Sequence, residues 1–508
     1  MEFIQNVMMG IEVAFTPTNI LFVFLGALIG MIVGIIPGFG ASAGLAILLP
    51  VTLSLEPTTA IIMLAGIYYG SQYGGAVTAI LINTPGDSAA VVTTFEGYKM
   101  TMKGQAGKAL IYQAIASFVG GAIGVFLIYT LIPFFTGVAM KFGPPEYFML
   151  MLMGLLTLVW MTDESRTKGM ISALIGLAVA TVGVDVISGM PRFTFNSPFL
   201  INGINFIPVA IGLFGVGELL HRIYEGGHKD VDVDSSNMDL SIKNKKNWPT
   251  WLEVWADKFA YIRGSVIGFV TGVLPGAGAT IASFFTYSVE KKVSKTPGKF
   301  GTGHSKGLVA PEAANNAATA GAMVPLLTLG IPGSASTAIL LGAFLMYGLQ
   351  PGPLLMTQNP EFSWGIITSM HLGNMILLII NIISIPLFLY IVKMPYRYLV
   401  PIIITLCIIG TFCLNSSFID VWLLLIFGLV GFFMKLYGYS PAALVLALVL
   451  GPLAENTLRQ SLIMSESGLG IFLSRPISLG FLILIFIIIV YPYISKLFNR
   501  NKNISKQA

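Results

Sequence analysis

Four Pro-Gly segments interrupt otherwise apolar stretches of this 508-residue chain. Two carry the pattern Pro-Gly-x-Gly, at 37–40 and 275–278, and two lie further on, in Asn83–Asp87 and Gly330–Ser334. A helix that breaks at Pro-Gly leaves carbonyl groups free at the end of its first half and N–H groups free at the start of its second half. The carbonyl end attracts a cation and the N–H end attracts an anion. The four breaks are therefore candidate binding sites for ions of both signs.

A hydroxyl or a carboxylate follows each break within about one helical turn. No Arg lies centrally in a long apolar run, so we expect an anionic substrate to be bound mainly by N–H groups, hydroxyls and amides. Bound cations would then offset its charge. The candidate substrate-binding residues are Pro37, Gly38, Gly40, Ser42, Asn83, Thr84, Pro85, Gly86, Ser88, Pro275, Gly276, Gly278, Thr280, Asn316, Pro332, Gly333, Ser334, Ser336 and Thr337.

Asp87 is the only carboxylate inside a break motif, and two roles stay open for it. It could bind Na⁺ or H⁺, or it could cap the next helix. Asn315 and Asn316 are adjacent on a predicted helix, so at most one of them faces a given site. The candidate ligands of a Na⁺ site are Asp87, Asn83, Asn315 and Gly330. We expect Na⁺ or H⁺ as the coupling ion and no other cofactor.

The alternative for a single break is a proline kink with close-packing glycines, which is common in membrane helices. The composition supports a membrane setting, since 55% of the residues are hydrophobic and 10% are charged, against about 25% charged in soluble domains. Several apolar runs approach the ~20 residues that span a bilayer. The pattern predicts an all-α polytopic membrane protein. No P-loop, HExxH motif or nucleophile elbow occurs, so neither an ATPase nor another enzyme is expected, and nothing indicates nucleic acid as a partner.

The breaks recur in the same order in two halves of the chain. Pro-Gly-x-Gly at 37–40 matches 275–278, and Asn83–Asp87 matches Gly330–Ser334. At three matching flanks of these breaks, Lys and Arg are present in one half and absent from the other, which predicts opposite orientations in the membrane. We therefore expect two inverted repeats with broken helices or re-entrant hairpins and about 11–13 membrane elements. The expected parts are an N-terminal repeat at 1–222, a cytoplasmic connector at 223–258, a C-terminal repeat at 259–495 and a cytoplasmic tail at 496–508.

The same charge bias predicts which side each segment faces. The N-terminus is expected outside, and the 223–258 loop and the C-terminus inside. Paired helix breaks in inverted repeats are typical of secondary transporters. The competing function class is a passive anion or cation channel with a backbone-lined filter, which saturable uptake dependent on a binding protein would exclude.

Several long motifs resemble the large membrane subunit of the bacterial tripartite tricarboxylate transporter family. They include GIIPGFGASAGLAILLP, YYGSQYGGAVTAILINTPGD and GLVAPEAANNAATAGAMVPLLTLGIPGSASTAILLGA, within residues 30–110 and 265–355. The resemblance implies import of di- or tricarboxylates such as citrate across the bacterial inner membrane, driven by a Na⁺ or H⁺ gradient. It implies a periplasmic solute-binding protein and a small membrane subunit as partners, and leaves a homodimer open. An elevator-type mechanism is a fold-level analogy.

Overall fold

A computed structural model describes residues 2–161, 165–185, 187–226, 238–274, 276, 278–392, 394, 396–487 and 489–490. These residues are almost entirely helical, and one short antiparallel pair of strands joins Gly183 to Arg192 and Val184 to Pro191. The strands are β1 (Gly183–Val184) and β2 (Pro191–Arg192). The prediction of an all-α polytopic architecture is confirmed by the helices and apolar spans described below.

The first part of the chain folds into eleven α-helices within the described residues. A 3₁₀ turn at Ser88–Ala90 precedes α5, and a π-helical stretch at Gly212–Val216 joins α10 and α11 into one run. The helices are α1 (Glu2–Ala14), α2 (Pro17–Ile35), α3 (Gly40–Leu48), α4 (Pro57–Ile82), α5 (Val91–Thr93), α6 (Lys99–Met102), α7 (Ala106–Ala139), α8 (Pro144–Met161), α9 (Arg166–Ala180), α10 (Phe206–Ile211) and α11 (Gly217–Tyr224).

The described residues of the second part are also helical. A short helix, α12, forms inside the predicted connector, of which 227–237 lie outside the described residues, as does the predicted tail at 496–508. The helices are α12 (Trp251–Ala256), α13 (Lys258–Val273), α14 (Gly278–Val293), α15 (Ser305–Leu329), α16 (Ala335–Met346), α17 (Pro353–Gln358), α18 (Pro360–Ser384), α19 (Phe388–Val392), α20 (Tyr396–Asn415), α21 (Phe418–Leu436), α22 (Pro441–Ile463) and α23 (Ile471–Ser474).

Seven helical runs in the described residues are long and apolar enough to cross a membrane, and a bent pair at 468–487 makes an eighth. Three shorter apolar helical runs, at 3–14, 40–54 and 335–346, fall below the ~20 residues that a full crossing needs. Two of them begin at predicted breaks, so α3 and α16 have the length of half-crossings. The total of 11–13 membrane elements stays a prediction. The seven runs are Pro17–Ile35, Ala106–Ala139, Phe206–Tyr224, Pro360–Val392, Arg397–Asn415, Phe418–Leu436 and Pro441–Ile463.

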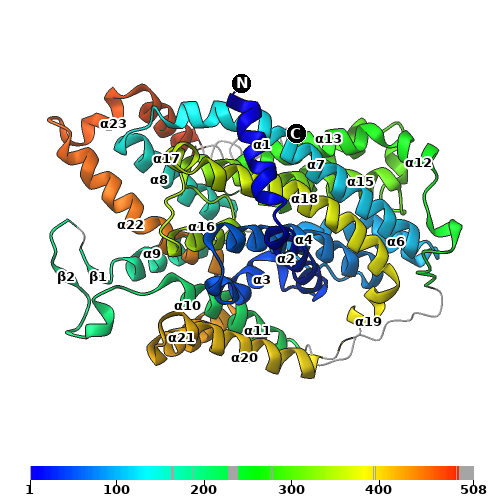
Figure 1. The fold of residues 1–508 in the computed structure, drawn as a ribbon, viewed down its shortest axis with the longest axis horizontal. Helices are drawn as coiled ribbons and strands as arrows, with labels where there is room; N and C mark the ends of the chain where they lie inside the picture. Colours follow the sequence, from blue (N-terminus) through cyan, green and yellow to red (C-terminus); the bar gives the residue numbers. More distant parts are fainter. Residues whose placement is uncertain are drawn as a thin grey trace, which may run out of the picture.

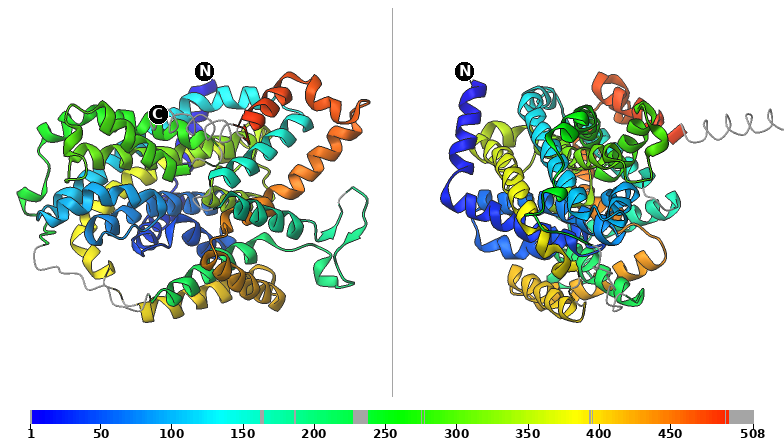
Figure 2. Two further views of the ribbon diagram at one scale, coloured as in Figure 1. Left: turned by 180° about the vertical axis from the view of Figure 1, so that it is seen from behind. Right: turned by 90° about the vertical axis from the view of Figure 1, so that its right-hand side faces the viewer.

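The helices that carry the breaks lie at the centre of the molecule. Figure 1 shows α3, α4 and α16 together in the middle, with α7, α13 and α15 toward one end. The β1–β2 hairpin projects from the opposite end to α12, as the left view of Figure 2 also shows. The core is continuous through α2, α4, α7, α15, α16 and α22. The breaks are therefore surrounded by packed apolar helices.

Glycines set the distance between α2 and α4 and between α13 and α15. A Cβ added at Gly34 would lie 2.3 Å from the carbonyl oxygen of Ser71, and one added at Gly272 would lie 2.2 Å from that of Ala318. Real Cβ atoms are not found so close, so only glycine allows these backbones to pack directly together. The two pairs of helices thus share one packing geometry at matching positions of the predicted repeats.

The long helices α4 and α15 end in the same backbone conformation. Asn83 closes α4 with φ 56° and ψ 23°, and Gly330 closes α15 with φ 69° and ψ 25°. This left-handed conformation ends a helix and turns the chain away from its axis. Asn tolerates it better than most residues with a side chain. The inverted orientation of the two halves in a membrane stays a prediction.

Candidate functional site

A cavity of about 440 Å³ lies where the four helix breaks meet. Its size falls within the ordinary range of small-ligand pockets. The breaks are far apart in sequence, and the packing of α3, α4, α14 and α16 brings them together. The predicted site residues that line the cavity are Gly38, Gly40, Ser42, Asp87, Ser88, Gly276, Gly278, Thr280, Gly333, Ser334 and Ser336.

Two hydroxyl pairs cross the cavity between the predicted repeats. The Oγ atoms of Ser42 and Ser336 are 3.0 Å apart, and Ser88 Oγ lies 2.7 Å from Thr280 Oγ1. Each pair joins a Pro-Gly-x-Gly segment of one half to the later break of the other half. A hydroxyl both donates and accepts, so each pair can turn its hydrogens toward a ligand. The hydroxyls predicted one by one from sequence form two paired groups.

The N-termini of four longer helices border the same cavity. They belong to α3, α14, α16 and α22, represented in the cavity wall by residues 40–43, 278–281, 334–336 and 440–442. The first N–H groups of a helix have no partner within the helix, and the helix dipole adds positive potential there. Such ends bind carboxylates and phosphates. The arrangement therefore favours an anionic ligand.

Asp87 adopts one of the two roles that the sequence leaves open, while keeping contact with the cavity. Its carboxylate accepts a hydrogen bond from Ala90 N at 3.0 Å, which is an N-cap. At the matching position, Ser334 Oγ accepts from Thr337 N at 3.3 Å. Thr337 Oγ1 in turn accepts from Ser334 N, so Thr337 stabilises the start of α16 and is absent from the cavity lining. Both breaks thus end in a capped helix.

Charged residues that the sequence reasoning did not select also reach the cavity. Glu218 of α11 and Lys435 of α21 line it and form an ion pair. Glu218 also accepts from Arg222 Nε at 2.9 Å, and the Arg222 guanidinium lies against Gly38. Two cationic side chains thus share one carboxylate beside the cavity. The excess positive charge increases the attraction of the cavity for an anion. The signal available in the sequence was a single Lys near the end of the apolar run 418–436.

Polar Tyr68 and Gln72 of α4 are two further lining residues that the site prediction omitted. Gln72 is placed to hydrogen-bond the Asp87 carboxylate, and Tyr68 faces Ser334. The two residues lie one turn apart on α4, on the same face of the helix, which is why they reach the same cavity. The signal available in the sequence was the Tyr-rich stretch 68–73.

Other predicted residues belong to the breaks without lining the cavity. Asn83 and Thr84 are exposed, and they lie on the carbonyl side of their break. Gly330 lines a separate cavity of about 660 Å³ with Gln350 and Pro351. The predicted residues absent from the lining are Pro37, Asn83, Thr84, Pro85, Gly86, Asn315, Asn316, Gly330, Pro332 and Thr337, and Pro275 lies outside the described residues.

The four predicted Na⁺ ligands are not gathered at one point. Asp87 lines the four-break cavity, Gly330 lines the neighbouring one, and Asn83 is exposed. Asn315 and Asn316 are buried on α15, where Asn316 Nδ2 donates to Asn315 Oδ1 at 2.6 Å. Both Asn residues belong to a buried polar cluster that is described below.

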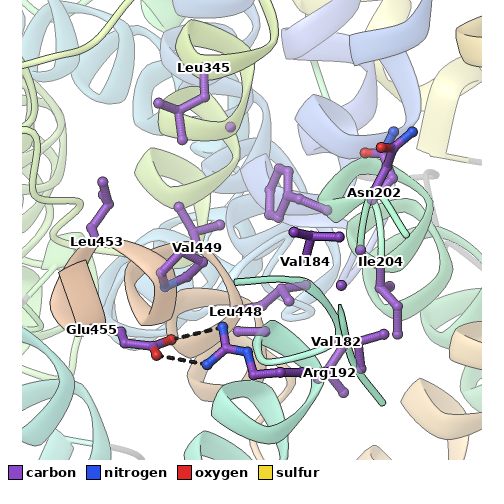
Figure 3. A pocket seen from close by; sticks show the side chains of 18 of the residues that line it. Val182, Val184, Arg192, Asn202, Ile204, Leu345, Leu448, Val449, Leu453 and Glu455 are labelled. Atoms are coloured by element: carbon purple, nitrogen blue, oxygen red, sulfur yellow. Dashed lines mark hydrogen bonds and ion pairs between the residues drawn. The ribbon is translucent and has the colours of Figure 1, made fainter. Parts of the chain in front are cut away.

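A larger cavity, about 740 Å³, lies elsewhere and has a different character. Apolar side chains from α22 and from the segment around the β hairpin form most of its wall, as Figure 3 shows. Its charged lining residues are Asp185, Arg192 and Glu455, and Arg192 binds Glu455 at two points, 2.7 and 3.2 Å. No helix break among the described residues contributes to it. This cavity is therefore less suited to a small anion than the four-break cavity.

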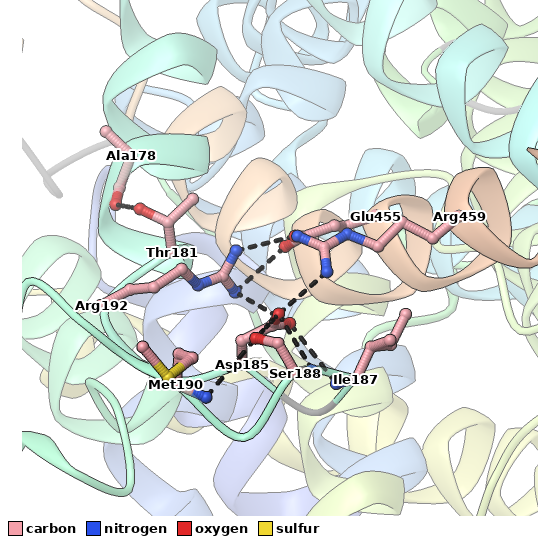
Figure 4. A network of polar contacts seen from close by, with 9 residues as sticks. All are labelled: Ala178, Thr181, Asp185, Ile187, Ser188, Met190, Arg192, Glu455 and Arg459. Carbon is pink, nitrogen blue, oxygen red and sulfur yellow. Dashed lines mark hydrogen bonds and ion pairs between the residues drawn. The ribbon is translucent and has the colours of Figure 1, made fainter.

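An ion network fixes the hairpin onto α22 beside this larger cavity (Figure 4). Arg459 Nη1 donates to Asp185 Oδ2 at 2.9 Å, and Arg459 Nη2 pairs with Glu455 Oε1 at 2.6 Å. Hydrogen bonds from the Ser188 hydroxyl and from Arg459 hold the pKa of the Asp185 carboxyl well below its usual range. Each charged side chain of this ion network is therefore paired with an opposite charge inside the network. This pairing indicates that the network has a structural role.

Comparison with known proteins agrees with this geometry. The family model described as "Tripartite tricarboxylate transporter TctA family" matches residues 20–446, a stretch that contains all four breaks. The chain belongs to the TctA family. The family is one of transporters, so the expectation that the chain is no enzyme is confirmed. It implies that this TctA protein is the large membrane subunit of a tripartite transporter, with a binding protein and a small membrane subunit as partners.

Two relatives from Agrobacterium vitis are similar along much of their length. The chain is 42% identical over 489 residues, covering 95% of this chain and 94% of the relative, to an uncharacterized 52.8 kDa protein in the TAR-I ttuC′ 3′ region. It is 43% identical over 215 residues, covering 42% of this chain and 89% of the relative, to an uncharacterized protein in the TAR-II ttuC′ 3′ region. No solved structure matches. This TctA protein is thus a multi-pass membrane protein of a transporter family.

Proposed function

We propose that this TctA protein imports di- or tricarboxylates, such as citrate, by secondary active transport across the bacterial inner membrane. A periplasmic binding protein delivers the substrate, and a Na⁺ or H⁺ gradient drives uptake. The observation that carries the proposal is the convergence of four helix N-termini and two hydroxyl pairs on one cavity. This set of donors matches a carboxylate, which accepts hydrogen bonds at two oxygens.

Binding in the cavity would replace the water around a carboxylate with fixed protein donors. The free N–H groups of α3, α14 and α16 and the hydroxyls of Ser42, Ser88 and Thr280 supply hydrogen bonds. Lys435 and Arg222 supply positive charge, part of which Glu218 already balances. A substrate with two or three carboxylates still carries excess negative charge, which a co-transported cation would offset. Binding of the anion and the cation would then depend on each other.

The proposed orientation places the N-terminus outside and the 223–258 loop and C-terminus inside. The opposite Lys and Arg bias of the two halves supports it. The segments 190–205 and 350–363 would then face the binding protein. Substrate could reach the cavity alternately from either side if one unit moved against the other, as elevator carriers do, and a homodimer would suit that motion. The mechanism rests on analogy at the level of the fold.

Uptake by reconstituted vesicles tests the function. The protein with its small subunit is placed in proteoliposomes, the binding protein is added outside, and labelled carboxylates are screened with an imposed Na⁺ gradient, an imposed pH gradient or neither. The proposal predicts saturable uptake that requires both the gradient and the binding protein. Gradient-independent flux that does not saturate would instead establish the passive channel.

Site variants tie the uptake to the cavity. The double change Ser42→Ala with Ser336→Ala should reduce uptake at low substrate by about 10-fold or more, since a hydrogen bond to a charged group contributes about 1.5–3 kcal/mol. Asp87→Ala and Gly333→Val should abolish uptake while the protein still reaches the membrane. Leu252→Ala, on an exposed side chain of α12 outside the four-break cavity, is the control. Normal uptake by all the site variants would remove the cavity from the mechanism.

A further inference from the structure

Glu312 is a fully buried carboxylate in the middle of the polar cluster on α15. Its exposed fraction is 0%, and α5 and α7 pack against the helix α15 that carries it. Thr93 donates its hydroxyl to Glu312 Oε1. Ser117 Oγ lies 3.3 Å from Glu312 Oε2, and Asn315 Nδ2 lies 3.4 Å from the same oxygen. Its side-chain donors are thus two hydroxyls and one amide, all of them neutral.

Three other buried carboxylates of the described chain have stronger partners. Glu146 accepts from Arg475 Nε at 2.6 Å, and Glu290 binds Arg263 at two points, 2.9 and 2.8 Å. Glu96 accepts from backbone N–H groups, including Gly303 N at 2.7 Å. Within the described ranges, no ion pair includes Glu312. A buried charge without an opposite charge is costly, so this position calls for a cation or a proton.

The surroundings of Glu312 also hold more hydrogen-bond acceptors than donors. Gln113 and Asn316 are each 0% exposed, and Gln113 Oε1 and Asn316 Oδ1 have no hydrogen-bond partner. Gln113 Nε2 donates to Ser117 Oγ at 3.1 Å, and Asn316 Nδ2 donates to Asn315 Oδ1. Both unpaired oxygens therefore belong to side chains that are hydrogen-bonded to neighbours of Glu312. Buried polar atoms normally have partners, and a proton on Glu312 would satisfy only one of these oxygens.

We propose that the Glu312 carboxylate, the hydroxyls of Thr93 and Ser117 and the unpaired amide oxygen of Gln113 bind a Na⁺ ion. Carboxylate, hydroxyl and amide oxygens are the ligands that hard cations take, and the single negative charge matches a monovalent ion. The described residues contain no group of three acidic, His or Cys side chains of the kind that holds a divalent metal. This inference rests on the proposed transport function and names its coupling ion and the position of that ion.

The location of Glu312 explains how the cation and the substrate would be coupled. Thr93 follows the Asp87–Ala90 cap by only a few residues, in the short helix that leaves the four-break cavity. Glu312 and Asp87 are close enough to interact electrostatically. Without a cation, two carboxylates would repel an anionic substrate in that cavity. Na⁺ at Glu312 removes most of this repulsion and holds Thr93 in place, so Na⁺ binding should precede and strengthen substrate binding.

Direct binding of ²²Na⁺ to the purified full-length protein, with its small subunit in nanodiscs, tests the proposal without any transport step. The wild type should bind ²²Na⁺ saturably, and excess unlabelled Na⁺ should displace it. Glu312→Gln keeps the side-chain shape and removes the charge, so ²²Na⁺ binding should weaken more than 10-fold. Asp420→Asn is the matched control, because Asp420 is also buried and accepts from a neutral amide, Asn415 Nδ2, at 2.8 Å.

A second variant separates loss of the site from misfolding. Ser117→Ala removes one neutral oxygen and should weaken ²²Na⁺ binding by roughly 10-fold, with an unchanged elution volume and melting temperature. Absence of saturable ²²Na⁺ binding to the wild type overturns the inference, as does unchanged binding by Glu312→Gln. The proposed function fails separately, if the wild type binds ²²Na⁺ but shows no gradient-driven carboxylate uptake.

Discussion

Buried carboxylates in this protein are each matched to a particular set of donors, and the set indicates the role. Glu96 is 0% exposed and accepts from the backbone N–H groups of Gly303 and His304 at 2.7 and 2.8 Å. It also accepts from the Tyr287 hydroxyl at 2.9 Å. These bonds connect the segment after the break at 83–87 to the turn that precedes α15. Glu96 is therefore a structural residue, in contrast to Glu312.

Replacing Glu96 should cost stability and leave the binding sites intact. Glu96→Gln places an amide N–H among donors, so we expect the free energy of unfolding to fall by about 2 kcal/mol, as for the loss of one hydrogen bond to a charged group. Unfolding of the purified protein measures this, and the turn at 297–304 should be cut faster by protease. Glu56→Gln, on an exposed residue that makes no capping hydrogen bond, is the control. Equal stability of the two variants would contradict the structural role.

At the scale of the helices, two glycine-lined contacts hold the broken elements at a fixed distance. Gly26, Gly30 and Gly34 of α2 face backbone atoms of α4, and Gly264, Gly268 and Gly272 of α13 face those of α15. Because these helices pack so closely, the breaks at their ends have little freedom to move. The hydroxyl pairs across the cavity depend on this alignment, because their members come from different halves.

An alanine at a central glycine of this contact should push the helices apart. A Cβ at position 268 would lie 2.2 Å from the carbonyl oxygen of Ala314, so Gly268→Ala should destabilise the protein by about 1–3 kcal/mol. Gly137→Ala in α7 meets open space and should instead be neutral or stabilising by up to about 1 kcal/mol. Thermal unfolding of the two variants in detergent measures the difference. If the Gly268→Ala variant were as stable as the Gly137→Ala variant, close packing of α13 on α15 would not be needed for stability.

At the scale of the whole molecule, the sequence predicts the positions of the breaks well, because Pro and Gly act locally. Ser42, Ser88, Thr280 and Ser336 were selected for lying just after a break, and they line one cavity. The selection of Asn83 and Thr84 was less informative, since the cavity faces the N–H ends of the breaks and these residues precede the proline.

Residues supplied by long-range packing were not predictable in this way. Glu218 and Lys435 reach the cavity because α11 packs against α21. In the sequence, charges near helix ends look the same as those that set membrane orientation. Glu312 was passed over for a related reason, because its lack of a basic partner is visible only once the neighbouring helices are placed.

A structure of the protein with a transported carboxylate bound would show whether the four-break cavity is the substrate site. The carboxylate with the fastest gradient-driven uptake is the ligand to use. We predict that the oxygens of the bound carboxylate lie within hydrogen-bond distance of the Ser42–Ser336 and Ser88–Thr280 pairs. They should also lie within hydrogen-bond distance of the N-termini of α3, α14 and α16. A carboxylate bound beside Arg192 and Glu455, or beside Gly330, with the four-break cavity empty, would contradict it.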